Sequence, residues 1–95
     1  MAKNATSKRK RVKFEVIADT GSKVFLAGSF NAWDDTAKEL KEKDGDGYFT
    51  GTLLLEPGEY EYKYVINGEW HIDAENPNFS QNKLGTLNSI VKVEE

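Results

Sequence analysis

The sequence predicts an all-β domain, an antiparallel β-sandwich of about seven short strands. Residues 12–16 alternate apolar and charged side chains, which is the period of a half-buried strand. Clusters of Gly, Asn, Asp and Pro recur at regular intervals, and helical periodicity is almost absent. The 95 residues contain no cysteine and suffice for one two-layered domain, but not for two.

The first half of the chain is expected to form three strands. Residues 12–16 form the first, a turn follows at residues 19–22, and residues 24–27 form the second. A short third strand is expected near residues 37–41, although residues 39–42 could instead form one helical turn.

Residues 44–47, Asp-Gly-Asp-Gly, have the composition of a hairpin turn. They also look like the start of a calcium loop, but such a loop needs oxygen ligands at further alternate positions. Tyr48, Phe49 and Thr50 follow instead. No metal site is therefore expected here.

The second half of the chain is expected to form four more strands. A turn at residues 56–59 and the Asn67-Gly68 pair separate three of them, and a loop over residues 76–83 leads into the last. The expected strands are residues 48–55, 60–66, 69–73 and 87–93.

The two-residue turn at Asn67-Gly68 determines which residues of its hairpin face each other. Val65 should oppose Trp70, Tyr64 should oppose His71, and the pairs Ile66–Glu69 and Lys63–Ile72 follow from the same register. Because opposed residues share a face of the sheet, the hairpin divides into two sets of side chains. One face carries Tyr60, Tyr62, Tyr64, Ile66 and His71, and the other carries Glu61, Lys63, Val65, Trp70 and Ile72.

The tyrosine face is the better candidate for the core, since Glu61 and Lys63 would be costly to bury. Trp70 would then lie on the outer surface beside Lys63, with Val65 and Ile72 beneath it. The alternative buries Val65, Trp70 and Ile72 and exposes the tyrosines.

Trp33 and Trp70 both lie at polar turns rather than within apolar runs. A large flat ring carried on such a turn is more often presented to a ligand than used to fill a core. The alternative for Trp33 is an aromatic ring that folds back over the end of the sandwich. The pair predicts a binding module.

Reactive chemistry is scarce in this sequence. His71 is the single histidine, and the hairpin register places it as a structural residue at the edge of the core. The acids are scattered through turns and strand exteriors, so neither a catalytic pair nor a metal site is indicated. No Gly-rich phosphate loop is present. We expect no enzyme activity, no metal and no cofactor.

The charge is unevenly distributed along the chain. Residues 1–13 contain six basic residues and no acid, whereas the remainder holds seven basic residues and all 16 acids. We expect residues 1–10 to be a disordered basic tail and residues 11–95 to be the binding domain. The acidic body argues against nucleic acid as the main partner.

No apolar run of about 18 residues is present, so no membrane-spanning segment is expected. The chain lacks the apolar stretch of a secretory signal and has no cysteine, and a cytoplasmic location is therefore expected.

Exposed tryptophans suit two classes of ligand, nucleobases and sugar rings. Bases would require a basic groove that follows the phosphates, which the acidic body does not favour. Pyranose rings are neutral, and their apolar C–H faces stack on indole while their hydroxyls meet polar neighbours. Sugars are therefore the favoured ligand.

Three motifs occur in order: Val-Phe-Leu-Ala-Gly-Ser-Phe-Asn-Ala-Trp at residues 24–33, Pro-Gly-Glu-Tyr-Glu-Tyr-Lys-Tyr-Val-Ile-Asn-Gly-Glu-Trp at residues 57–70, and Leu-Gly-Thr-Leu-Asn-Ser at residues 84–89. Together they resemble the glycogen-binding domain of the AMP-activated protein kinase β subunit. The N-terminal domains of starch debranching and glycogen-branching enzymes are similar. The resemblance covers about residues 12–93.

The resemblance implies an immunoglobulin-like, early-set β-sandwich that binds α-1,4-linked glucans such as glycogen and starch. Carried over by position, Trp33 and Trp70 would stack on sugar rings and Lys63 would bond sugar hydroxyls. Leu84 would reach into the curve of the glucan helix, and Thr86 and Asn88 would close the rim. Structural roles are implied for Gly28, Phe30, Asn31 and Gly85, the glycines as conformationally permissive positions.

The resemblance further implies a glucan-metabolising enzyme or a kinase assembly as a partner.

Residues 34–36 and 40–47 are more acidic than expected beside a carbohydrate-binding face. The alternative function is a protein-interaction or domain-docking sandwich that keeps the fold without binding sugar.

Overall fold

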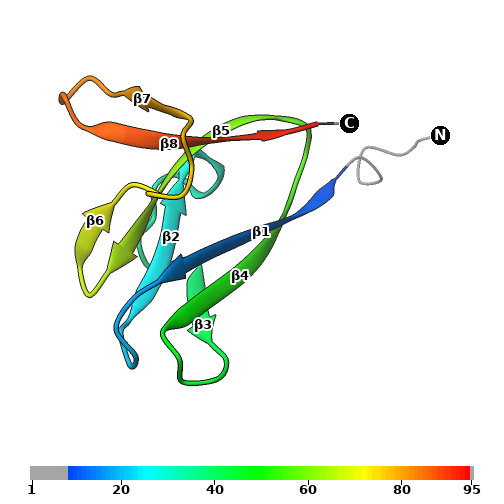
Figure 1. Cartoon of the computed structure of the whole chain (residues 1–95). Coiled ribbons are helices and arrows are strands. Elements are labelled where there is room, and N and C mark those ends of the chain that lie inside the picture. Colours follow the sequence, from blue (N-terminus) through cyan, green and yellow to red (C-terminus); the bar gives the residue numbers. More distant parts are fainter. Residues whose placement is uncertain (1–8, 95) are drawn as a thin grey trace.

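The computed structural model describes residues 9–94, and it is built from β-strands (Figure 1). Within these residues lie eight strands and one short 3₁₀ helix, η2 (Ser29–Asn31). The strands are β1 (Lys10–Ile17), β2 (Val24–Gly28), β3 (Glu39–Glu42), β4 (Tyr48–Leu55), β5 (Gly58–Ile66), β6 (Glu69–His71), β7 (Phe79–Gln81) and β8 (Leu87–Val93). Most of the expected basic tail, residues 1–8, lies outside the described residues.

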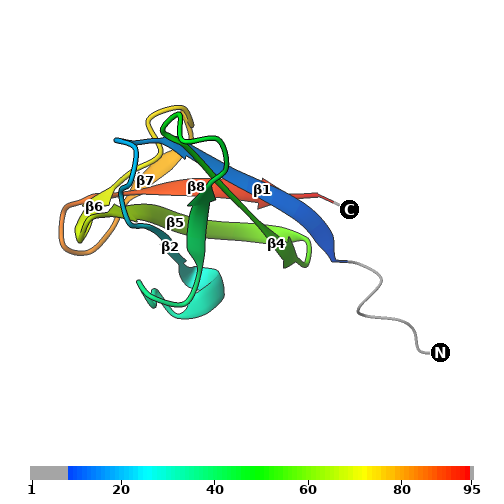
Figure 2. The ribbon, with the colours of Figure 1, turned by 90° about the horizontal axis from the view of Figure 1, so that it is seen from below.

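All strand pairs are antiparallel, and the all-β prediction is confirmed. The strands follow one another in the order β1-β4-β3-β2-β5-β8-β7, and β6 pairs with β5 off this path. Because β3 pairs with both β2 and β4, it joins the two layers into one continuous sheet. This sheet curls over, so that β1 and β4 run obliquely to β5 and β8 when seen from below (Figure 2).

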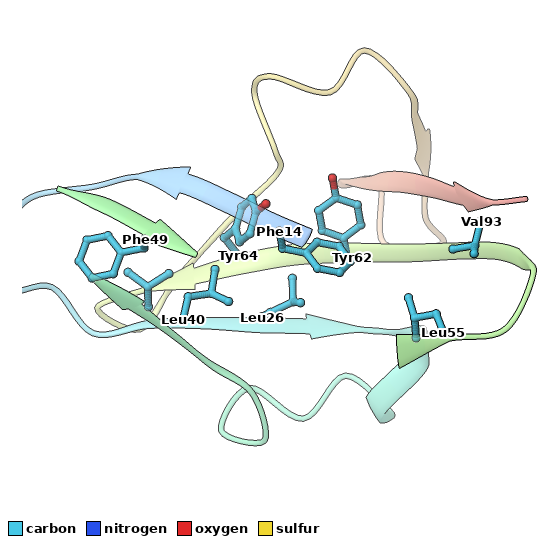
Figure 3. Close-up of a cluster of buried hydrophobic side chains, with 9 residues drawn as sticks. Phe14, Leu26, Leu40, Phe49, Leu55, Tyr62, Tyr64 and Val93 are labelled. Carbon is cyan, nitrogen blue, oxygen red and sulfur yellow. The ribbon is translucent and has the colours of Figure 1, made fainter. Parts of the chain in front are cut away.

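The hydrophobic core lies between the two layers of the curled sheet (Figure 3). The edge of one ring meets the face of the other where Phe14 of β1 approaches Tyr62 of β5, with ring centroids 5.1 Å apart. The Tyr64 hydroxyl donates a 2.9 Å hydrogen bond to the backbone carbonyl of Glu15 in the opposite layer. The core cluster consists of Phe14, Val24, Leu26, Leu40, Phe49, Leu55, Tyr62, Tyr64 and Val93.

The tyrosine face of β5 is therefore the core face, as predicted. Tyr62 and Tyr64 are 3% and 1% exposed. Burial raises the pKa of both hydroxyls, and the nearby Asp73 carboxylate raises them further. The alternative assignment, with Trp70 in the core, is wrong. Val65 is nevertheless buried on the outer face, since it pairs with Phe25 on one side and Trp70 on the other.

The short third strand expected near residues 37–41 is confirmed as β3, and the helical-turn alternative for residues 39–42 is wrong, because Leu40 pairs with Val24 and is buried in the core. Other elements differ from the expectation. The strand after the Asn67-Gly68 turn ends at His71 and not at Asp73, so the expected Lys63–Ile72 pair does not form part of the ladder. β7 was not predicted.

The chain stops pairing with β5 after His71, because Asp73 forms hydrogen bonds with Ser89 and Tyr62 instead. Its backbone N–H donates to the Ser89 hydroxyl at 2.7 Å, and its carboxylate accepts from the Tyr62 hydroxyl at 2.7 Å. These contacts draw the segment towards β8 and the core.

Candidate binding groove

Trp33 is positioned by the turn that ends β2. The Asn31 side chain braces this turn, since its Oδ1 accepts from the Gly28 N–H at 3.0 Å and its Nδ2 donates to the Leu26 carbonyl at 3.1 Å. Ala32 and Trp33 then adopt left-handed conformations, with φ of 58° and 60°. Two successive non-glycine residues in this region are unusual, and such strain is often found at functional sites.

Phe30 and Gly28 support the same turn. The Phe30 ring packs against Phe14, with ring centroids 5.8 Å apart. Gly28 has extended backbone geometry, with φ of −168°, so the expected need for conformational freedom is wrong at this position. A β-carbon there would lie 2.5 Å from the Phe30 ring and 2.6 Å from the Glu61 carbonyl oxygen. Lack of space requires glycine here.

Trp70 is presented by the β5–β6 hairpin, whose register is the predicted one. Tyr64 pairs with His71 and Val65 pairs with Trp70. The turn residues Asn67 and Gly68 have φ of 51° and 85°, as a tight hairpin requires. Trp70 is 44% exposed and lies on the outer face, as predicted.

His71 differs from its expected place at the edge of the core. Its side chain is about half exposed, and its Nε2 lies 3.6 Å from a Glu69 carboxylate oxygen. β6 is a short edge strand here, so the face that continues into the core at Tyr64 is open to solvent at His71.

The loop from Asn82 to Thr86 carries the third part of the site, and Asn82 organises it. Asn82 Oδ1 accepts from the backbone N–H groups of Leu84 and Thr86, at 2.9 and 3.1 Å. Its Nδ2 donates to Thr86 Oγ1 at 2.6 Å and to Asn88 Oδ1 at 3.3 Å. Gly85, with φ of 87°, completes the turn in the permissive role expected of it. Leu84 is thereby held at the loop tip, 89% exposed.

Polar side chains of β5 and β8 join the loop to the sheet. Lys63 Nζ donates to Thr86 Oγ1 at 3.2 Å. Asn88 is buried, and its Nδ2 donates to Glu61 Oε1 at 2.8 Å. The Asn88 amide thus has a partner at each end within the protein. Lys63 and Glu61 remain half-buried.

All six predicted binding residues line one groove, which has a volume of about 500 Å³. They are Trp33, Lys63, Trp70, Leu84, Thr86 and Asn88. Glu61, Asn82 and Lys83 line the same groove and were not predicted. Of these three residues, only Asn82 had a signal in the sequence. It stands at the start of a turn, where an asparagine side chain commonly forms a hydrogen bond with the backbone two residues later. The contribution of Glu61 depends on its cross-sheet bond to Asn88, and no sequence pattern reports that bond.

The acids that looked out of place beside a carbohydrate-binding face bond to nearby loops. Asp34 Oδ1 accepts from the backbone N–H and the hydroxyl of Thr36, at 2.9 and 2.8 Å. These bonds, the backbone one first, lower the pKa of Asp34. The Glu42 carboxylate accepts from Thr20, Gly21 and Gly47. Both carboxylates thus shape turns.

Within residues 9–94, no group of three His, Cys, Asp or Glu side chains is placed to hold a metal ion. No helix in this part of the chain has the length and apolar character needed to cross a lipid bilayer.

Comparison with known proteins gave a consistent set of matches. A family model described as "Glycogen recognition site of AMP-activated protein kinase" matches residues 12–95. The mouse 5'-AMP-activated protein kinase subunit beta-2 is 33% identical over 76 residues, which cover 80% of this chain and 27% of that protein. The human subunit beta-1 is 36% identical over 73 residues, which cover 77% of this chain and 25% of that protein. The chain therefore spans about a quarter of the length of these relatives.

Proposed function

Because this chain belongs to the family of the glycogen recognition site of AMP-activated protein kinase, we propose that it binds α-1,4-linked glucans without catalysis. Glycogen, starch and malto-oligosaccharides are the ligands of this class. One observation carries the proposal: both tryptophans and four flanking side chains line a single groove.

The two indole rings supply the main apolar contact. Covering about 100 Å² of apolar surface on each ring contributes roughly 2–3 kcal/mol before the cost of ordering the sugar. The left-handed backbone at Trp33 and the tight hairpin before Trp70 hold both rings in place, which lowers the ordering cost on the protein side. With a few hydrogen bonds, such stacking predicts a dissociation constant of roughly micromolar to millimolar.

The remaining side chains supply hydrogen bonds and shape. Lys63 donates to sugar hydroxyls while keeping its contact with Thr86, since an ammonium group has three donors. Thr86 and Asn88 complete the rim of the groove. Leu84 inserts into the curve of the glucan helix, and its 89% exposure leaves it free to be covered by the ligand.

The wider setting of the module follows from its relatives. Those proteins are subunits of 5'-AMP-activated protein kinase, so a kinase assembly or a glucan-metabolising enzyme is the expected partner. The module would bring that partner to a glucan surface. A cytoplasmic location, expected from the sequence, is part of the same proposal.

The proposal is tested by titrating the chain with β-cyclodextrin or maltoheptaose and following the backbone amides by NMR. The amides of Trp33, Lys63, Trp70 and Asn88 should shift together as the ligand is added. Cellobiose, a β-linked disaccharide, serves as the ligand control and should cause much smaller shifts. If no α-linked ligand causes a shift at millimolar concentration, the docking alternative replaces glucan binding.

A further inference from the structure

A second groove lies on the outer face of the sheet, beside the first. Its volume is about 330 Å³. Six residues from β5, β7, β8 and the segment before β7 line it: Glu59, Pro77, Asn78, Phe79, Ile90 and Lys92. None of these residues was predicted from the sequence to belong to a site, and the proposed glucan contacts do not use them.

The two grooves are neighbours along β5 and β8. Glu61 lines the first groove, and its cross-strand partner Ile90 lines the second. The next residues on the same face, Glu59 and Lys92, are also directly paired. Two residues of a strand span about 7 Å, so the second groove begins within one or two sugar units of Glu61. β5 and β8 run side by side through this region (Figure 1).

The lining of the second groove suits a neutral, hydroxylated ligand. Ile90 is half-buried, so its apolar side chain is available to a sugar face. Glu59 and Lys92 offer an acceptor and a donor, and neither side chain forms an ion pair within residues 9–94. Their opposite charges leave no net charge that would select an ionic ligand.

The segment beside this groove is anchored to the sheet and the core. The Asn78 carbonyl accepts from the Ile90 N–H at 2.9 Å. Asn76 Nδ2 donates to the Tyr62 hydroxyl at 3.0 Å and to the Ile90 carbonyl at 2.8 Å, and Asn76 Oδ1 accepts from the Asn78 N–H at 2.9 Å. The groove is therefore formed before any ligand arrives, which reduces the cost of binding.

We propose that the second groove is an extension subsite, across which a glucan chain continues after it leaves the first groove at Glu61. The inference rests on the proposed function, and it adds a contact that only longer chains reach. Short oligosaccharides fill the first groove alone, whereas longer ones contact both.

The test compares maltotriose with maltoheptaose by isothermal titration calorimetry. The double variant Glu59→Ala/Lys92→Ala should bind maltotriose as the parent does but bind maltoheptaose about fivefold more weakly than the parent, the ratio that corresponds to about 1 kcal/mol of lost contact. Leu54→Ala, which removes an exposed apolar side chain from β4 in the other layer, is the control and should behave as the parent.

NMR on the parent chain gives a second measurement that does not depend on any variant. The amides of Ile90 and Lys92 should shift with maltoheptaose and not with maltotriose. The inference is overturned if the parent binds both oligosaccharides equally, or if the double variant binds maltoheptaose as tightly as the parent does. It is also overturned if the double variant, verified as folded by thermal melting, weakens both ligands equally. If the parent binds neither oligosaccharide, the proposed function fails and the subsite fails with it.

Discussion

At the scale of single residues, the groove depends on side chains that the backbone holds in place rather than on reactive groups. Trp33 follows a braced turn, Trp70 follows a tight hairpin, and Leu84 lies at the tip of a loop organised by Asn82. In each case a polar side chain or a left-handed residue determines where the apolar group points. The shape of the groove therefore depends on residues such as Asn31 and Asn82, whose side chains bond to the backbone.

Trp70→Ala should remove most glucan binding while leaving the fold intact. The ring is 44% exposed and lies outside the core cluster, so its loss should lower the free energy of unfolding by less than about 1 kcal/mol. The affinity for maltoheptaose should fall at least tenfold, because the ring supplies roughly 2 kcal/mol of apolar contact. Calorimetric titration and urea unfolding measure the two effects, with Leu54→Ala as the control. A Trp70→Ala variant that is strongly destabilised but keeps its affinity for maltoheptaose would contradict the proposed binding role of Trp70.

Gly28→Ala should destabilise the domain although the backbone geometry suits any residue. The added methyl group would meet the Phe30 ring and the Glu61 carbonyl oxygen at distances no side chain tolerates, and one of them would have to move. Crowding of this kind costs typically 1–3 kcal/mol, measured by urea unfolding.

Gly21→Ala separates this crowding from backbone conformation. Gly21 has φ of 83° and no atom within 4 Å of an added β-carbon, so its cost of about 1 kcal/mol would be purely conformational. If Gly28→Ala were as stable as the parent chain, the prediction would be wrong, and the close approach of β2 and β5 at Gly28 would not require glycine.

At the scale of secondary-structure elements, alternation and turn chemistry were enough to predict the strands of the hairpins. Residues 48–55 were predicted with the observed bounds, and the Asn67-Gly68 turn gave the correct register. β7 was missed because Phe-Ser-Gln is too short for a period to appear, and it forms only by pairing with β8. η2 was missed because it is equally short, with only three residues, and a single helical turn shows no periodicity.

The candidate groove was predictable to a similar degree. The six residues proposed from the resemblance line one groove, while Glu61, Asn82 and Lys83 were not identified. The place of Glu61 depends on a bond to Asn88, which is 27 positions away in the sequence. Contacts of that separation become apparent only when the strand order is known, because β5 and β8 are separated in sequence by two shorter strands.

Glu42 links two loops in a way that should respond to acid. Its carboxylate accepts hydrogen bonds from the Thr20 hydroxyl and the N–H groups of Gly21 and Gly47, and these bonds, that of Thr20 first, lower its pKa below the usual 4.5. A lowered pKa in the folded state means that this stabilisation is fully present above pH 4.5 and is lost as the pH falls through the folded value.

The Glu42 side-chain carboxyl carbon should therefore titrate, by NMR, with a midpoint below 4.5, and the Gly47 amide should follow the same curve. Glu42→Gln should abolish this response of Gly47 and leave the shifts of the binding groove unchanged, since the groove residues do not include Glu42. A midpoint at the ordinary value for glutamate would show that the carboxylate does not hold the loops in solution.

At the scale of the whole molecule, the curled sheet explains how so short a chain presents a binding face. One face of β5 contributes Tyr62 and Tyr64 to the core, and the other contributes Lys63 and Glu61 to the groove. Alternate residues of the same strand thus face the core and the groove. The pairing of β3 with β2 and with β4 keeps both layers in one hydrogen-bonded sheet, so the groove has a rigid base.

This continuity predicts that the chain unfolds in a single transition. The core cluster draws side chains from both layers, and neither layer has an apolar face of its own that could remain buried without the other. Tryptophan fluorescence, which reports the groove, and far-ultraviolet circular dichroism, which reports the sheet, should therefore give the same melting temperature. Two separate transitions would mean that the loops carrying the groove melt before the sheet.

The same cooperativity should make glucan binding visible as a rise in melting temperature. A ligand that binds only the folded chain stabilises it by about 1.4 kcal/mol at ten times its dissociation constant, which corresponds to roughly 5–8 °C for a domain of this size. Maltoheptaose should produce this shift in the parent chain and in Leu54→Ala, and at most about a third of it in Trp70→Ala at the same concentration. A ligand raises the melting temperature of the whole cooperative unit wherever it binds, so the parent chain alone does not reveal the position of the sugar. The Trp70→Ala variant does: a shift of equal size in that variant would mean that the sugar binds away from the groove.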